Sequence, residues 1–290
     1  MDANEALAER FEEHRIRLRA VAYRMLGSLS EADDAVQEAW LRLSGAAAKD
    51  VENLGGWLTT VVARVCLNML RSRRTHAEVP LEPHIPDPVV SSEDGVEPED
   101  EALLADSVGL ALLVVLDALP PAERLAFVLH DMFAVPFDEI GPMVGRSPAA
   151  ARQLASRARR RIQEAPTPDR DPSRQRAVVD AFFAAARGGD FDALVAVLDP
   201  GVVHRSDWGV LPGSSVIRGP EAVAGQALLF ADPSRIVHPA LVNGAAGAVI
   251  TVEGMPVSVV GFTVVKDRIV AIDALVDPER VASLDLSFLN

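Results

Sequence analysis

The sequence predicts a multidomain chain in which two all-α domains precede an α+β domain. Apolar residues recur at spacings of three and four over residues 5–70 and again over 108–162, as in amphipathic helices. After residue 174, two helical segments give way to short β-rich runs. Two stretches without this periodicity predict linkers. The expected division is residues 1–74, a linker at 75–106, residues 107–165, a linker at 166–173, and residues 174–290.

The first domain is expected to be a bundle of three helices. The apolar pattern from Glu5 breaks at Gly27-Ser28, resumes until Gly45, and starts again near Trp57 after a polar loop that carries Asn53. The third helix ends in a cluster of arginines, which are Arg71, Arg73 and Arg74. A basic helix end beside an exposed loop suits contact with a single nucleic-acid strand. A solvated helix end is the competing interpretation.

Residues 75–106 hold ten carboxylates and no lysine or arginine. The stretch is also rich in proline and has no apolar period, so we expect it to be extended or disordered. The net charge of the chain is −14, of which this linker carries −10, while residues 1–74 are neutral and 107–165 carry +1. The overall charge therefore does not exclude nucleic-acid binding, because the local field decides docking.

The last two helical segments of the second domain predict a helix-turn-helix. Residues 137–144 form the first helix and 147–162 the second, with Gly145 between them. Pro142 is expected to bend the first helix or end it early. A helix that enters the major groove must expose donors to base edges and phosphates. The residues in that position are Ser147, Arg152, Gln153, Ser156, Arg157, Arg159 and Arg160. An amphipathic helix with a solvated basic face is the alternative.

The remaining composition limits the class of protein. One cysteine, Cys66, allows no internal disulfide, and no His or Cys spacing suits zinc. We therefore expect neither a metal nor a cofactor. No stretch approaches the length of apolar residues that a membrane span needs, and the N-terminus lacks the order of a signal peptide. The chain is expected to be a cytoplasmic protein without a membrane partner.

Tyr23–Gly27, Asp33–Trp40, Trp57–Arg74 and the helix-turn-helix together resemble the sigma-70 family, in its extracytoplasmic-function (ECF) group. The resemblance implies that the chain binds the RNA polymerase core, at its clamp and flap, and directs it to promoter DNA. It places polymerase binding at Asp33, Asp34, Gln37, Glu38 and Trp40. It places contacts with the minus-ten element at Asn53, Arg64, Asn68, Arg71, Arg73 and Arg74. The helix-turn-helix residues named above would read the minus-thirty-five element.

Each of these assignments has a plainer alternative from the residues alone. Asp33, Asp34 and Glu38 also suit a solvated acidic helix face near an N-terminus. Trp40 and Trp57 are of the type that packs in a core. The acidic linker could lie in the positively charged nucleic-acid channel of the polymerase or simply be solvated.

The C-terminal segment resembles the SnoaL-like (NTF2-like) cone domain that some ECF sigma factors carry. The resemblance rests on Ala184–Phe191, Arg218-Gly219, Val242–Gly244 and Ile269–Asp273. Such cones enclose a pocket, for which His204, Asp207, His238 and Asp273 are the polar candidates. No spacing dictates a reaction, so we expect no catalytic residue. Satisfied polar groups are the alternative.

The resemblance also implies that the tail contacts the sigma regions of the same chain and regulates them in cis. Relatives with such a tail carry a tryptophan-leucine-proline motif in the linker, and Leu81–Pro83 and Pro86–Pro88 match it poorly. Two other functions stay open, a ligand-sensing helix-turn-helix repressor and a SnoaL-type enzyme fused to a DNA-binding arm. A repressor would bind duplex DNA without polymerase. An enzyme would keep its turnover without residues 1–165.

Overall fold

The computed structural model describes residues 3–45, 53–76, 84–93, 109–165, 168–169, 171–209 and 213–289. The chain divides into two compact units. Unit 1 comprises Met1–Val79 and Leu113–Ala165, and unit 2 comprises Pro80–Leu112 and Pro166–Asn290. Among the described helices, none has the length and apolar character needed to cross a membrane.

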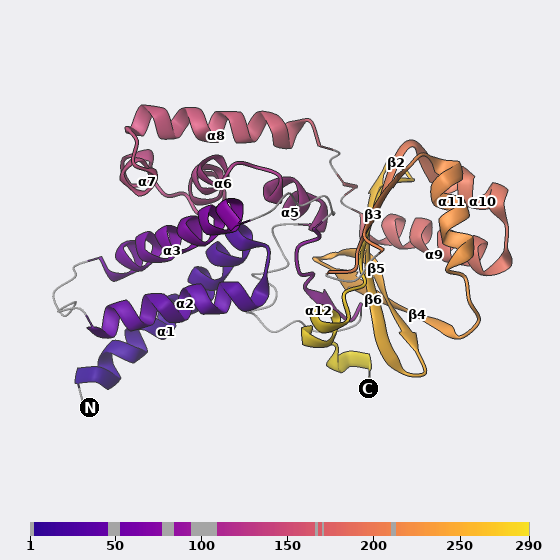
Figure 1. Ribbon diagram of the computed structural model, residues 1–290, viewed down its shortest axis with the longest axis horizontal. Helices are drawn as coiled ribbons and strands as arrows, with labels where there is room; N and C mark the ends of the chain where they lie inside the picture. Colours follow the sequence, from indigo (N-terminus) through magenta and orange to yellow (C-terminus); the bar gives the residue numbers. More distant parts are fainter. Residues whose placement is uncertain are drawn as a thin grey trace. The chain divides into compact units, whose positions relative to one another are not determined.

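The first part of unit 1 is the predicted three-helix bundle (Figure 1). Its helices are α1 (Ala3–Leu26), α2 (Leu29–Gly45) and α3 (Leu54–His76). The apolar stripes meet in a core in which Leu18, Tyr23, Leu43 and Leu58 are fully buried. Burial of these stripes, rather than helix propensity, stabilises the bundle.

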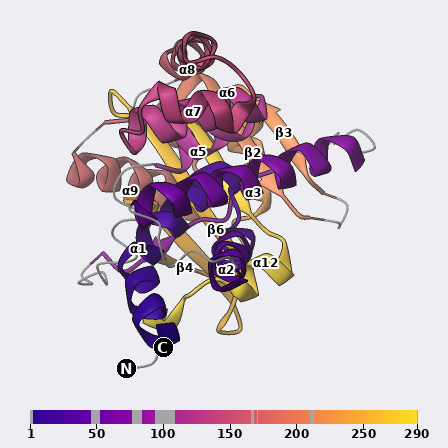
Figure 2. The same cartoon turned by 90° about the vertical axis from the view of Figure 1, so that its left-hand side faces the viewer.

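The second part of unit 1 contains the predicted helix-turn-helix. The elements are α5 (Leu110–Asp117), α6 (Pro121–Phe127), a π-helical turn η2 (Val128–Met132), α7 (Phe137–Val144) and α8 (Pro148–Gln163). The long helix α8 packs on α6 and α7, as Figures 1 and 2 show. Pro142 does not end α7 early, because the helix continues to Val144.

Polar contacts join the two helical parts of unit 1. The Arg124 guanidinium donates to the carbonyl of Met25 at 2.8 Å and to the Asp117 carboxylate at 3.0 Å. Arg17 donates to the carbonyl of Phe133 at 2.9 Å. Helix α3 also packs against α6. The two helical parts therefore form one body in this structure, with Arg124 almost completely buried between them.

Unit 2 is built on one seven-stranded sheet in the order β1-β4-β5-β6-β7-β2-β3. The strands are β1 (Val90–Ser91), β2 (Leu198–Asp207), β3 (Ser215–Arg218), β4 (Arg235–Val242), β5 (Ala245–Val252), β6 (Met255–Val265) and β7 (Arg268–Leu275). All neighbours are antiparallel except β2 and β7, which are parallel. The predicted α+β class is confirmed.

Each face of the sheet has its own apolar core. Helices α9 (Pro172–Gly188), α10 (Phe191–Val197) and α11 (Pro220–Leu229) lie on one face (Figure 1). Phe182 of α9 packs there against Phe262 of β6, with ring centroids 5.5 Å apart. The other face carries Ile85, Val90 and residues of the C-terminal elements α12 (Pro278–Ser283) and η3 (Ser287–Leu289).

Residues 84–93 of the predicted linker are extended, but they are not flexible, because they are bound to the tail domain. Val90 and Ser91 form β1, which extends the tail's sheet by pairing with Val242 and Leu241 of β4. Ile85 is fully buried in the second core. Apolar side chains and free backbone groups at a sheet edge stabilise this arrangement, although the local sequence is acidic and proline-rich. Leu81–Pro83 and the rest of the predicted linker lie outside the described residues.

Candidate functional site

Helix α3 exposes one polar stripe. Arg64, Asn68 and Arg71 are exposed and lie at spacings of four and three, so they share a helix face. Arg73, by contrast, is bound within unit 1 to the Glu31 carboxylate and to the carbonyl of Leu26. The side chain of Arg74 lies outside the described residues. The predicted minus-ten set is therefore divided into an exposed stripe and a residue with a structural contact.

Asn53 has a structural contact as well. Its side-chain oxygen accepts a hydrogen bond from the Gly56 N–H at 2.9 Å and so caps the N-terminus of α3. The residue is exposed, so this cap does not remove it from the surface. It lies immediately before the helix that carries the exposed stripe.

Helix α2 presents the predicted polymerase-binding residues in two groups. Asp34 and Gln37 are exposed. Asp33 pairs with Arg19 at 2.6 Å, Glu38 pairs with Arg42 at 2.9 Å, and Trp40 packs on Phe11. Such exposed ion pairs contribute about 0–1 kcal/mol, so the two carboxylates can exchange partners at little cost.

The predicted set omits one residue of this face. Leu41 is 56% exposed and lies seven residues after Asp34 and four after Gln37, so all three share a stripe. The side chain is therefore available on the same surface as Asp34 and Gln37. The helical spacing from Asp34 was the signal that could have identified it.

The turn of the helix-turn-helix depends on two glycines and a serine. Gly145 ends α7 with a φ of 67°, and the Arg146 N–H closes the turn onto the carbonyl of Gly141 at 2.9 Å. The Ser147 hydroxyl then accepts from the Ala150 N–H and caps α8. Ser147 is therefore the N-cap of α8.

Replacing Gly141 by alanine is expected to destabilise this turn. A Cβ at Gly141 would lie 2.8 Å from the carbonyl oxygen of Arg146 and 3.1 Å from the Pro148 nitrogen. These are backbone atoms, so the turn itself must shift, at a cost of about 1–3 kcal/mol. Urea denaturation of the Gly141→Ala variant measures this loss. Gly45→Ala, in open space at the end of α2, is the control and should leave the stability within about 0.5 kcal/mol.

The structure separates the predicted arginines of α8 by their contacts. Arg157 and Arg161 lie 3.6 Å and 3.3 Å from the Glu123 carboxylate, and Arg159 pairs with Asp131 at 2.6 Å. Arg152 lies over the ring of Phe137, 5.3 Å from its centroid. These contacts fasten α8 to α6, η2 and α7.

The exposed stripe of α8 consists of Gln153, Ser156 and Arg160. They are spaced by three and four residues and share one face, opposite the buried alanines 151, 155 and 158. Within the described chain, Arg160 makes no ion pair. This stripe offers an amide, a hydroxyl and a guanidinium, which are the groups that bind base edges and phosphates.

Only one of the four predicted pocket residues of the tail faces its cavity. The cavity is lined by His204, Ser206 and Trp208 together with residues of α9, α11, β6 and β7. Asp207 and Asp273 occupy the alternate positions of β2 and β7 and point to the opposite face of the sheet. His238 lines a different hollow and contacts the Thr251 hydroxyl at 2.9 Å. The expectation of a shared pocket is thus wrong for these three residues.

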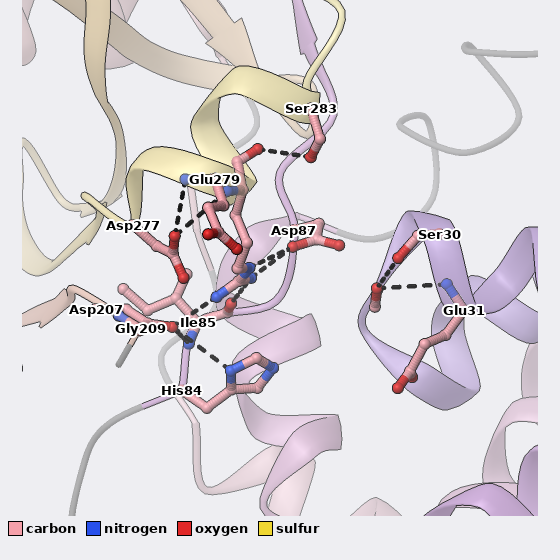
Figure 3. A network of polar contacts seen from close by, with 12 residues as sticks. Ser30, Glu31, His84, Ile85, Asp87, Asp207, Gly209, Asp277, Glu279 and Ser283 are labelled. Carbon is pink, nitrogen blue, oxygen red and sulfur yellow. Dashed lines mark hydrogen bonds and ion pairs between the residues drawn. The ribbon is translucent and has the colours of Figure 1, made fainter. Parts of the chain in front are cut away.

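Asp207 instead binds the linker. Its carboxylate accepts from the Ile85 N–H and from the Arg280 guanidinium, each at 2.8 Å (Figure 3). Arg280 also donates to the Asp87 carboxylate at 2.8 Å and to the carbonyl of Ile85 at 2.5 Å. We call this group of four residues, Ile85, Asp87, Asp207 and Arg280, the linker anchor. Asp277 orients it by capping α12, the helix that carries Arg280.

The anchor holds Asp207 in its charged form. Burial opposes ionisation, but hydrogen bonds from His84, Ile85 and Gly209 and the charge of Arg280 outweigh it. The pKa of Asp207 therefore lies well below its ordinary value. The carboxylate is only 5% exposed, so each of its partners matters for stability.

Two further contacts fasten the same segment. Asn243 and Val89 exchange hydrogen bonds, the N–H of Asn243 donating at 2.8 Å and its side-chain oxygen accepting at 3.2 Å. Arg176 of α9 pairs with Glu93 at 2.5 Å. Two of the linker's carboxylates, Asp87 and Glu93, are thus neutralised by the tail. No group of side chains suited to a metal occurs among the described residues.

Two families of promoter-recognition domain match the chain. Sigma-70 region 2 matches residues 10–76, and sigma-70 region 4 matches residues 109–162. These ranges coincide with α1–α3 and with the segment from α5 to α8. The fold and these surfaces therefore define a sigma-70 type transcription initiation protein.

Relatives that match nearly the whole chain define the group of sigma factors more narrowly. The probable ECF RNA polymerase sigma factor SigI of Mycobacterium tuberculosis H37Rv is 35% identical over 289 residues, 98% of each chain. The ECF RNA polymerase sigma factor SigJ of the same strain is 39% identical over 277 residues, 90% of this chain and 86% of that one. The crystal structure of SigJ matches with a TM-score of 0.77 at 33% identity, covering 96% of this chain and 99% of the other.

The chain therefore belongs to the ECF sigma factors, in the group with a SnoaL-like C-terminal domain. It acts as an alternative sigma factor in transcription initiation. Neither a repressor nor a tethered enzyme is supported by these relatives.

Proposed function

We propose that this sigma factor contacts its promoter through two exposed helix faces. The stripe of Arg64, Asn68 and Arg71 on α3 would bind the minus-ten element, with Asn53 beside it. The stripe of Gln153, Ser156 and Arg160 on α8 would read the minus-thirty-five element. Exposure and helical spacing support both assignments. Arg152, Arg157 and Arg159, together with Arg73, mainly hold the two helices in place.

The α8 stripe predicts two different effects on promoter binding by the complete polymerase holoenzyme. Arg160→Ala removes one phosphate contact and is expected to weaken binding on all sequences, reducing the salt slope by about 1. Gln153→Ala is expected to lose about 1–3 kcal/mol of discrimination at one base pair and to leave the salt slope unchanged. Filter binding at several salt concentrations and on single-base promoter variants separates the two outcomes. Identical behaviour of both variants would contradict the assignment.

We further propose that Asp34, Gln37 and Leu41 on α2 bind the clamp of the polymerase core, and that the second helical part binds the flap. The exposed leucine in a polar stripe supports the first assignment. The low cost of exchanging the Asp33 and Glu38 ion pairs supports their participation.

The tail is proposed to regulate in cis by holding the linker between the two sigma regions. The observation that carries this proposal is that the linker supplies strand β1 and the buried Ile85 to the tail's own sheet. Catalysis by the tail is not part of the proposal, because Asp207 and Asp273 are on the face opposite the cavity. The protein would act in the cytoplasm, together with the polymerase.

Run-off transcription with purified core polymerase tests this function. Full-length protein, a version ending at Ile162 and the Arg280→Ala variant are compared on the same promoter fragments. Promoter-specific transcripts from the full-length chain establish the sigma activity. A change in yield with both altered proteins assigns regulation to the anchored tail, whereas unchanged yields would remove the tail from the proposal.

A further inference from the structure

The tail domain encloses an apolar cavity that the sigma activity does not use. It has a volume of about 160 Å³ and lies between the sheet and helices α9 and α11. Aromatic rings from three elements line it, among them Phe182, Phe183, Trp208 and Phe262. The whole lining belongs to unit 2, so the cavity depends on the tail domain alone.

Small residues keep this space open. Four alanines form part of the wall, from α9, α11, the loop after α11, and β7; they are Ala186, Ala227, Ala231 and Ala274. A leucine or valine at any of these four positions would fill part of the cavity. Protein interiors are otherwise packed to high density. The open space among rigid aromatic rings is therefore a property of a binding site.

One polar side chain of the cavity wall, His204, makes no hydrogen bond to the described residues. His204 of β2 lines the wall, and its Nδ1 is buried without a partner among the described residues. Burial, reinforced by the positive charge of Arg205, lowers the pKa of His204 to about 4. At neutral pH the ring is uncharged, so it presents one N–H donor and one nitrogen acceptor. Because Nδ1 is fully buried, a molecule in the cavity can reach the ring only through its other nitrogen, Nε2.

The other polar residues of the lining differ from His204. The Ser206 hydroxyl is bonded to Ser215 at 3.0 Å. Arg235 lies over the Phe230 ring, 5.0 Å from its centroid, and Asp232 lies nearby with a pKa lowered chiefly by Ser234 and also by Arg235. The charged residues of the lining are Arg187, Arg235 and Asp232, none of them fully buried, while the histidine between the aromatic rings is neutral.

We propose that this cavity binds a neutral, single-ring molecule that carries a hydroxyl group, with the hydroxyl hydrogen-bonded to His204. The size argues for one ring, because a cavity of about 150 Å³ lined by apolar residues holds one benzene molecule. A hydroxyl both donates and accepts, so it complements either tautomer of a neutral imidazole. An anion would lose its hydration between the aromatic rings without a buried positive partner.

The test uses the full-length protein and three probes of equal ring size, p-cresol, toluene and benzoate. Ligand-detected NMR titrations give the dissociation constants. We expect p-cresol to bind about three- to tenfold more tightly than toluene, which is the effect of one neutral hydrogen bond. Benzoate should bind most weakly. Tighter binding of benzoate, equal binding of p-cresol and toluene, or no binding of p-cresol at millimolar concentration would overturn the proposal.

Variants locate the site. His204→Phe should remove the preference for p-cresol over toluene, because the ring volume stays and the hydrogen bond is lost. Ala227→Leu and Val260→Phe fill the cavity from opposite walls and should each abolish binding of both probes. Ala222→Leu, on the exposed side of α11, is the matched control and should change nothing. Binding that survives in a folded cavity-filling variant, with folding checked by circular dichroism, would contradict the site.

Discussion

The Arg280→Ala variant is expected to lose about 3–5 kcal/mol of stability in the tail domain and to release residues 84–91 from the sheet. Arg280 is only 21% exposed and pairs with two carboxylates, Asp87 and Asp207, that are buried more deeply still. Removing one partner of a buried ion pair leaves an uncompensated charge, which accounts for the size of the effect. Urea denaturation measures the loss, and hydrogen exchange at the Ile85 and Val89 amides measures the release.

Arg174→Ala is the matched control for this experiment. Arg174 also pairs with a carboxylate of the tail, Asp267, but both side chains are more than half exposed. Such exposed pairs contribute little to stability, because solvent screens them. The control should therefore keep both the stability and the slow exchange of the Ile85 amide. Equal effects of the two substitutions would show that the linker anchor does not hold the linker.

The tail domain is expected to lose about 3 kcal/mol of stability as the pH falls from 6.5 to 4, through the titration of His204. Burial and the charge of Arg205 lower the pKa of this histidine from 6.5 to about 4 in the folded protein. Between these values the unfolded chain binds a proton that the folded chain does not, so stability is complete above pH 6.5 and falls with the pH. Each pKa unit corresponds to about 1.4 kcal/mol.

A His204→Gln variant isolates this contribution. Glutamine keeps a polar side chain of similar length but does not titrate, so the difference in stability between wild type and variant from pH 6.5 to 4.5 isolates His204. The pKa of Asp273 is raised by burial, so its contribution also changes with pH, but equally in both proteins. The pKa of Asp207 is lowered in the folded protein, so its contribution to stability is lost only as the pH falls below about 4. This loss is the same in wild type and variant. Urea denaturation at half-unit intervals of pH compares the two. Parallel curves for wild type and variant would contradict the assignment to His204.

The helical regions were predicted well because their signals are local. The helix-turn-helix was expected at 137–144 and 147–162, and the helices span Phe137–Val144 and Pro148–Gln163. Gly145 ends the first helix and Ser147 caps the second, and each of these roles depends only on residues close by in the sequence. Strands β6 and β7 likewise lie within the β-rich runs that were expected after residue 174.

The linker could not be predicted in the same way. Its acidity and prolines indicated disorder, while the residues that fix it, Asp207, Asn243 and Arg280, lie more than a hundred positions further along the chain. A pattern of neighbouring residues cannot show that two segments so far apart in the sequence contact each other. Ile85, Val89 and Val90 were the available signal, as apolar residues within an acidic stretch.

The pocket residues show a different limit. His204 and Asp207 are three positions apart on β2, and side chains at odd separations in one strand face opposite ways. Once the strand is known, the two cannot share a cavity. The sequence indicated the residue types correctly but did not establish where β2 begins, so their faces remained undetermined until the structure was known.

The linker anchor also limits how far apart parts of the chain can move. His84 lies eight positions after His76, the end of α3, and Leu110, the start of α5, lies seventeen positions after Glu93. At about 3.3–3.6 Å per residue, these tethers reach at most about 29 Å and 61 Å. Release of the anchor would replace them by a single tether of thirty-four residues with a contour length of about 120 Å. The anchor therefore divides the acidic linker into two shorter tethers, each joined to the tail domain instead of directly to the other sigma region.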